Sequence, residues 1–232
     1  MKSISQEEFM EKGKIIVIEG ACDGMGKTTQ YKMLIDHFRN DGQEIAYHHF
    51  PSYGTYQAIA VEKYLSGELG QSDELSPYFV TNLYATDRGI TWFSNLKQLY
   101  EQGKIILLDR YTTSSLIYQS ALIEGIEQKK KFVDYVIDFE YRKIGIKEPD
   151  NVIFLHAPFD LVTEMRNARK QNEGITNDIH ENNLNFMKKV YESAMFIADY
   201  LSWDKVQCNI GNKMREIDDI HEEIYSLVKR EK

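Results

Sequence analysis

The feature that most constrains the fold is a glycine-rich loop between an apolar run and a segment with helical spacing. The run Ile15–Ile18 precedes this loop, which ends in Gly26-Lys27-Thr28, and Thr28–Asn40 follows with helical periodicity. In such a loop, backbone amides and a helix N-terminus point at phosphates, a lysine neutralises them, and a hydroxyl holds magnesium. The sequence therefore predicts a P-loop in which Lys27 reaches the β- and γ-phosphates and Thr28 ligates Mg²⁺.

The loop departs from the usual G-x-x-x-x-G-K pattern, because one additional residue separates Gly20 from Gly26. Either Ala21 takes the place of the first glycine, which a negative φ would allow, or the loop bulges by one residue. The residues predicted to bind the nucleotide are Gly20, Ala21, Cys22, Asp23, Gly24, Met25, Gly26, Lys27, Thr28 and Thr29.

Short apolar runs alternate with longer segments of helical spacing along the chain. The predicted strands are Ile15–Ile18, Glu44–Phe50, Ile105–Leu108, Val152–Leu155 and Lys205–Ile210. The predicted helical segments are Thr28–Asn40, Asp73–Gln102, Asp178–Ser202 and Met214–Arg230. This alternation indicates an α/β fold with three layers (α/β/α) and a five-stranded parallel sheet. The fully apolar runs suit central positions, whereas the polar-flanked Lys205–Ile210 suits an edge.

A chain of 232 residues, 42% of them hydrophobic, is long enough for one well-cored domain, with residues 1–12 as an N-terminal extension. The net charge of −8 argues against a general nucleic-acid binder, although a local basic site can occur in an acidic protein. No apolar stretch approaches the roughly 18 residues of a membrane span. The polar N-terminus and the two cysteines, Cys22 and Cys208, favour a cytoplasmic location.

The histidines predict no structural metal site. Their spacing is not typical of zinc ligands, and His48 and His49 lie in a predicted strand with side chains on opposite faces.

Several short motifs occur in a definite order from Lys14 to the last helix. They are the loop Glu19–Gln30, Phe50-Pro51, Leu83–Arg88, Asp109-Arg110-Tyr111, Pro149-Asp150 and, after a basic segment, Asp178–Glu181. Each motif is weak alone, but together and in this order they resemble the thymidylate kinase family of P-loop nucleoside monophosphate kinases. The resemblance implies a P-loop NTPase fold with a short lid, and transfer of the γ-phosphate of ATP to dTMP with Mg²⁺.

Phosphoryl transfer needs positive charge around the transferred group, and Lys27 and Arg110 supply it. Asp109 follows a buried run and therefore lies at the carboxyl edge of the sheet, where ligands bind; a capping aspartate paired with Arg110 is the alternative. We expect Asp109 to be catalytic and to ligate the metal. A carboxylate at Asp23 is unfavourable beside phosphates unless it faces a metal, a sugar hydroxyl or the acceptor, so it is assigned to these roles; a turn-forming aspartate is the alternative.

Tyr84 and Arg88 are four residues apart and share a helix face. The resemblance implies that Tyr84 stacks on thymine and that Arg88 bonds a base carbonyl, work that suits an aromatic face and a planar donor. The alternative is a core tyrosine and a surface arginine. Phe50, with Pro51, is expected near the deoxyribose or base, or simply in the core at a strand end.

A helix is also predicted to start at Thr112, after Asp109-Arg110-Tyr111. The resemblance implies that Ser115 contacts the base and that the ring of Tyr118 lies near the sugar 2′ position, where it would exclude a ribose hydroxyl. Gln119 is assigned to the same acceptor site, as is Arg110.

The segment from about 165 to 181 is expected to be the lid over ATP. Because Gly24 follows Asp23, the resemblance implies that the lid supplies the catalytic arginine, which we assign to Arg169, with Arg166 on ATP. Asp178 and Glu181 either ligate the metal or form a capping box. Ile179 stands where relatives commonly have an arginine.

Three functional hypotheses follow. The first is a dTMP kinase; the second is a deoxynucleoside kinase, against which Phe50-Pro51 and Asp23 count; the third is a nucleotide-binding regulatory protein that lacks turnover, suggested by the widened loop and Ile179. The family commonly forms homodimers, and Asp73–Gln102 is apolar enough for such an interface, although burial in its own core explains the same pattern. The cationic side chains are expected to converge on one cleft that binds ATP and dTMP.

Overall fold

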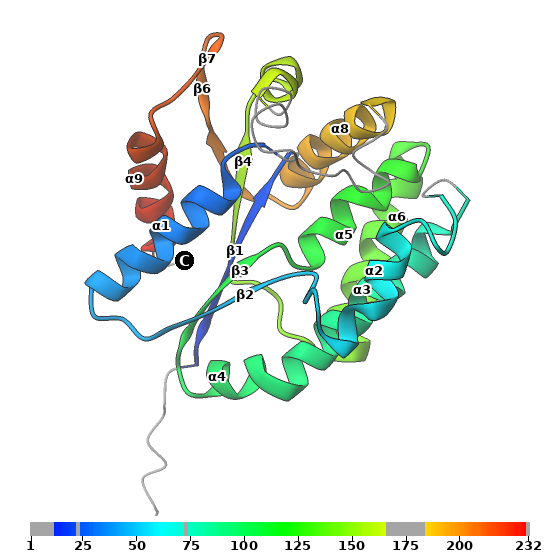
Figure 1. Cartoon of the computed structure of the whole chain (residues 1–232), viewed down its shortest axis with the longest axis horizontal. Helices are drawn as coiled ribbons and strands as arrows, with labels where there is room; N and C mark the ends of the chain where they lie inside the picture. The colour runs from blue at the N-terminus through cyan, green and yellow to red at the C-terminus, as the bar shows by residue number, and fades with distance from the viewer. Residues whose placement is uncertain (1–11, 22–23, 72–73, 166–183, 231–232) are drawn as a thin grey trace, which may run out of the picture.

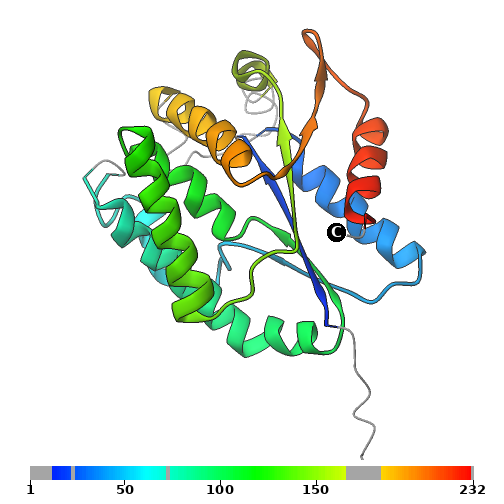
Figure 2. The same cartoon turned by 180° about the vertical axis from the view of Figure 1, so that it is seen from behind.

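A parallel sheet in the order β2-β3-β1-β4-β5 forms the centre of the computed structural model, which describes residues 12–21, 24–71, 74–165 and 184–230. The strands are β1 (Lys14–Gly20), β2 (Ile45–His49), β3 (Ile105–Asp109), β4 (Asn151–His156) and β5 (Asp204–Gln207). The three fully apolar runs occupy the inner positions, because both of their faces are covered by helices (Figures 1 and 2). The predicted α/β class and five-stranded parallel sheet are therefore confirmed.

Helices cover both faces of the sheet (Figure 1). On one side lie α1 (Lys27–Asn40) and α9 (Ile217–Val228); on the other lie α3 (Pro77–Thr91), α5 (Thr112–Tyr118) and α6 (Ile126–Ile137). The remaining helical elements are η1 (Tyr56–Ala58), α2 (Ile59–Leu65), η2 (Trp92–Leu96), α4 (Lys97–Glu101), η3 (Ser120–Leu122), η4 (Asp138–Ile144) and α8 (Leu184–Tyr200).

Alternate residues of β1 enter two separate cores. Ile16 and Ile18 pack with residues of α1, α8 and α9, whereas Ile15 and Val17 pack with the aromatic and aliphatic side chains of η2. This alternation follows from the period of two in a strand. The central strand is thereby fixed on both faces, and its carboxyl end holds the loop that leads into α1.

Three predicted boundaries differ from the structure. The segment Asp73–Gln102 is divided, because the π-helical turn η2 separates α3 from α4. The predicted strand Lys205–Ile210 ends at Gln207, and the chain then forms a hairpin of β6 (Asn209–Ile210) and β7 (Lys213–Met214), whose turn contains Gly211 at φ 56°. Because β7 uses Lys213–Met214, α9 begins at Ile217 and not at Met214.

Of the predicted helix Asp178–Ser202, the part from Leu184 to Tyr200 is described and is helical. Within the described ranges, no helix is long and apolar enough to cross a membrane.

Candidate active site

The phosphate loop lies between the carboxyl end of β1 and the start of α1. The amide of Ala21 donates to the Leu155 carbonyl at 3.0 Å, and Gly24 and Gly26 have φ of 98° and 79°, which glycine adopts without strain. Ala21 does not have a positive φ, since Arg110 and Ser202 are the non-glycine residues with one in the described part of the chain. This geometry allows Ala21 to take the place of the first glycine. Cys22 and Asp23 lie outside the described residues.

Lys27 is the first residue of α1, and its side chain is buried at the base of the loop. Its positive charge is close enough to Asp109 to lower the pKa of that carboxyl. Thr28 and Thr29 follow on the exposed side of the first helical turn. The helix N-terminus and the Lys27 ammonium are thus available to a polyphosphate at one end of the sheet.

Asp109 ends β3 beside this loop. Burial raises the pKa of Asp109, but a hydrogen bond from His49 and the charges of Lys27 and Arg110 outweigh burial and hold the pKa below its ordinary value. Its Oδ2 accepts from Nδ1 of His49 at 3.1 Å, while its buried Oδ1 has no partner among the described residues. An unpartnered carboxylate oxygen fits a hard cation such as Mg²⁺.

Glu19 is fully buried in β1, where it connects the phosphate loop to α5. Its Oε2 accepts from the hydroxyls of Thr113 at 2.9 Å and Ser114 at 2.6 Å, and its Oε1 lies 3.9 Å from Nη1 of Arg110. The sequence motif included Glu19, but gave no indication of this role.

Arg110 has φ of 67°, in the left-handed region that a bulky residue seldom adopts. Its amide donates to the Ile18 carbonyl at 3.3 Å, its Nη1 donates to Ser114 at 3.4 Å, and its guanidinium lies 5.5 Å from the centre of the Tyr118 ring. Strained backbone of this kind is concentrated at functional sites.

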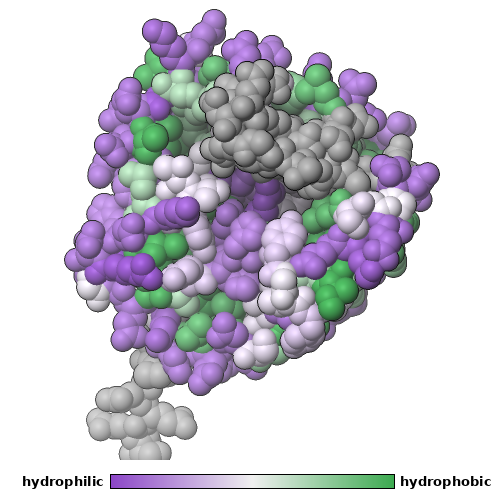
Figure 3. Space-filling view, viewed as in Figure 1, coloured by the Kyte–Doolittle hydropathy of each residue, from purple (hydrophilic) through white to green (hydrophobic). Residues whose placement is uncertain are grey.

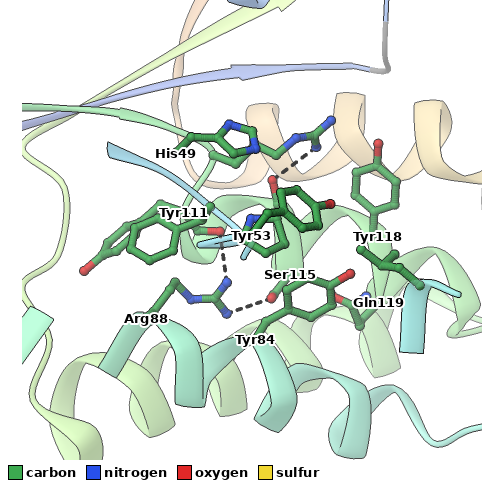
Figure 4. A pocket seen from close by; sticks show the side chains of 13 residues that line it. His49, Tyr53, Tyr84, Arg88, Tyr111, Ser115, Tyr118 and Gln119 are labelled. Carbon is green, nitrogen blue, oxygen red and sulfur yellow. Dashed lines mark hydrogen bonds between the residues drawn. The ribbon is translucent and has the colours of Figure 1, made fainter. Parts of the chain in front are cut away.

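A cavity of about 280 Å³ lies beside Arg110, between the ends of β2 and β3 and the helices α3 and α5 (Figure 4). This volume is near the lower end of the range for small-molecule sites, about 300–1,000 Å³. The predicted acceptor residues that line it are Phe50, Pro51, Tyr84, Arg88, Arg110, Ser115, Tyr118 and Gln119. The lining residues that sequence reasoning missed are His49, Tyr53, Leu65, Tyr111 and Ser114.

Arg88 forms the floor of this cavity and is only 2% exposed, so the alternative of a surface arginine is wrong. Its Nε and Nη2 each donate to the fully buried Glu140 carboxylate at 2.6 Å, and Nη2 also donates to Ser115 at 2.8 Å. Burial opposes the charge, but Glu140 outweighs it and raises the pKa of Arg88 above its ordinary value. Nη1 donates to the Tyr111 carbonyl at 3.4 Å, which leaves one Nη1 hydrogen for a ligand.

The two ends of the cavity are lined by different side chains. Figure 4 shows Arg88, Ser115 and Tyr84 on one side and His49 on the opposite side, with Tyr118 between them at the wall. The His49 side is next to Asp109, and thus next to Lys27 of the phosphate loop. On the face drawn in Figure 3, the side chains around the central hollow are hydrophilic or of intermediate hydropathy.

The remaining predicted site residues lie outside the described residues. They are Arg166, Arg169, Asp178 and Glu181, together with the greater part of the predicted lid. Among the residues that are described, no three His, Cys, Asp or Glu side chains are close enough to hold a metal without a ligand.

The chain is similar to known proteins over most of its length. The family model for thymidylate kinase matches residues 18–224. The thymidylate kinase of Thermoanaerobacter sp. (strain X514) is 31% identical over 94% of this chain and 98% of its own, and that of Plasmodium falciparum (isolate 3D7) is 27% identical over 94% and 90%. A solved thymidylate kinase structure from Candida albicans, 20% identical, aligns with a TM-score of 0.70 over 94% of this chain and 92% of its own. The chain therefore belongs to the thymidylate kinase family.

Proposed function

We propose that this protein transfers the γ-phosphate of ATP to dTMP, giving dTDP and ADP. The observation that carries the proposal is the cavity beside the phosphate loop, which collects eight predicted acceptor residues from α3, from α5 and its end, and from the segments that follow β2 and β3. Arg88 and Ser115 lie at one end of the cavity and His49 at the other (Figure 4). Arg110 also lines the cavity, and its contacts with Ile18 and Glu19 place it next to the phosphate loop, as a nucleotide phosphate requires. A monophosphate bound in this orientation presents its phosphate to the γ-phosphate of ATP.

The residues of the acceptor cavity have separate tasks in this proposal. The free Nη1 hydrogen of Arg88 bonds a base carbonyl, and the ring of Tyr84 stacks on thymine. Ser115 and Gln119 complete the polar contacts, and the Tyr118 ring excludes a ribose 2′-hydroxyl.

At the phosphate end, Lys27 and Arg110 neutralise the transferred group, and the loop amides bind the β-phosphate. Mg²⁺, when bound with ATP, draws negative charge away from the β- and γ-phosphates. Thr28 and the unpartnered Oδ1 of Asp109 are the described groups that would hold it. A site with so few protein ligands is typical of magnesium that is carried largely by substrate phosphates.

Residues outside the described ranges have the roles expected from the sequence. Asp23 contacts the acceptor or the metal, Arg169 is the catalytic arginine of a lid over about 165–181, and Arg166 binds ATP. Asp178 and Glu181 ligate the metal or cap the following helix. We further propose one kinase domain over 1–232, a cytoplasmic location and no nucleic-acid partner.

A coupled assay of ADP release tests the proposed function. We expect ATP turnover with dTMP, weaker turnover with dUMP and much weaker turnover with UMP, since Tyr118 stands beside the sugar; thymidine, dGMP and buffer alone should give only background. Activity with thymidine but not dTMP would favour a deoxynucleoside kinase. ATP binding without turnover of any acceptor would favour a regulatory protein.

We also propose that the chain forms a homodimer through α3. A shallow apolar hollow on α3 and the adjoining η2 is lined by small residues such as Ala85 and Gly89 and by Phe93 of η2, which is 55% exposed. Small residues let a second helix approach closely, and an exposed phenylalanine beside them suits burial against a partner.

Changing Phe93 to aspartate is expected to convert the dimer into a monomer, because it places a charge in the centre of the apolar contact. Light scattering coupled to size-exclusion chromatography measures the mass. Tyr56→Asp is the matched control, since Tyr56 is still more exposed but lies outside this hollow. A monomeric wild-type chain, or a dimer that persists in Phe93→Asp, would contradict the α3 interface.

A further inference from the structure

His49 and Asp109 meet because of the register of two parallel strands. His49 ends β2, Asp109 ends β3, and the two residues are paired across the sheet. The amide of Phe50 donates to the Asp109 carbonyl at 3.1 Å, which continues this pairing one residue further. The side chains of both residues are therefore held at the same edge of the sheet, beside the phosphate loop.

The direction of the hydrogen bond between them follows from their charges. An aspartate is ionised at neutral pH and its oxygens can only accept, so Nδ1 of His49 donates to Oδ2 of Asp109 at 3.1 Å. A carboxylate with one oxygen held in this way has its plane and its second oxygen fixed as well. That second oxygen, Oδ1, is the buried atom without a partner.

We propose that His49 is a positioning residue for phosphoryl transfer: its Nδ1–H fixes the Asp109 carboxylate so that Oδ1 is ready for the metal that accompanies ATP. The inference rests on the proposed function and adds to it a residue outside the predicted site. Histidine–carboxylate pairs around metals act in this way, and losing the outer partner costs about 10–100-fold in metal affinity or activity.

A second contribution of His49 has to be separated from this one. The side chain is 44% exposed, lines the acceptor cavity and stacks on Tyr53 with ring centres 6.0 Å apart. Removing the whole ring would therefore disturb dTMP binding as well as Asp109. Two amide substitutions control for this effect, because both remove the ring, while the side-chain amide of asparagine can replace Nδ1 as a donor and that of glutamine reaches the position of Nε2.

The experiment compares His49→Asn with His49→Gln in the full chain. Mn²⁺ replaces Mg²⁺ as the probe, and its affinity for the complex with ADP is measured by electron paramagnetic resonance. We expect His49→Gln to weaken Mn²⁺ binding, and to lower kcat with Mg²⁺, about 10–100-fold, while His49→Asn stays within about threefold of wild type. The KM for dTMP should change much less than kcat in His49→Gln.

His48→Asn is the matched control, since His48 lies on the same strand but faces the other way, towards the Ser52 hydroxyl at 2.8 Å. It should leave Mn²⁺ affinity unchanged, and thermal melting checks that all variants are folded. Equal Mn²⁺ affinity in His49→Gln and His49→Asn, or a loss confined to the KM for dTMP, would overturn the role of His49. A wild-type chain that binds Mn²⁺ and ADP but does not phosphorylate dTMP would instead count against the proposed function.

Discussion

Replacing Glu140 with alanine is expected to lower the free energy of unfolding by about 3–5 kcal/mol, the cost of leaving one member of a buried ion pair alone. Glu140 is fully buried and accepts two hydrogen bonds from Arg88 and one from Thr112 at 2.9 Å. After the substitution, a guanidinium that is 2% exposed would lose the only carboxylate among its described hydrogen-bond partners. Denaturant unfolding monitored by circular dichroism measures the change.

Two comparisons show whether the effect comes from burial. Glu127→Ala removes a carboxylate that pairs with Lys130 at 2.8 Å on the exposed face of α6, and it should change stability little. The double variant Arg88→Met/Glu140→Leu removes both buried charges and should recover much of the stability lost in Glu140→Ala. Since it also lacks the Arg88 donor, it should still bind dTMP poorly.

Stability and dTMP binding report on different contacts of Arg88. If Glu140→Ala were as stable as Glu127→Ala, the pair would contribute nothing to folding, and Arg88 could not be held by Glu140 in the cavity. If the double variant bound dTMP normally, Arg88 would not contact the base.

The regular part of the fold could be predicted from the sequence because it depends on local patterns. Ile15–Ile18, Ile105–Leu108 and Val152–Leu155 are apolar on both faces and form the three inner strands. Spacing of four residues also predicted that Tyr84 and Arg88 share a helix face, whereas their assignment to the acceptor site came from the resemblance to the family. The structure then brings that face to the same cavity as the end of β2 and the start of α5.

The partners of the buried charges could not be predicted in the same way. Glu140 is 52 residues from Arg88 in the sequence and Glu19 is 94 from Thr113, so no local pattern connects them. Glu140 also lies in a π-helical turn, and apolar periodicity does not reveal such a turn. His49 could in principle have been predicted, since it lies near the end of the predicted strand Glu44–Phe50 and Asp109 directly follows the predicted strand Ile105–Leu108, at the same edge of the sheet.

These partners change the expected charge of the site. The sequence indicated a cleft in which cationic residues converge, but Arg88 is paired with Glu140, Arg110 lies near Glu19, and Lys27 acts on Asp109. Buried charges need partners because desolvation is otherwise too costly. The described part of the site therefore holds its cations in place with acids. Under the proposed function, the additional positive charge that two nucleotides require would come from the metal and the lid arginines.

Replacing Lys27 with methionine is expected to lower kcat with dTMP by at least about 10²–10³-fold, the usual cost of removing one group that stabilises charge in the transition state. Methionine preserves much of the length and the apolar stem of lysine, so the loss reflects the ammonium. The Lys27 ammonium is expected to stabilise the transition state of phosphoryl transfer more than it stabilises bound ATP. The substitution should therefore lower kcat more than the affinity for ATP, which isothermal titration calorimetry measures separately.

Arginine at the same position is not expected to restore activity, because a planar guanidinium is larger than an ammonium and directs its donors differently. Lys32→Ala is the matched control, since Lys32 lies on the exposed face of the same helix and should retain normal kcat. If Lys27→Met retained a tenth or more of wild-type kcat, the loop after β1 would not be the site of phosphoryl transfer. The expected loss would show that the loop acts in phosphoryl transfer although one additional residue separates Gly20 from Gly26.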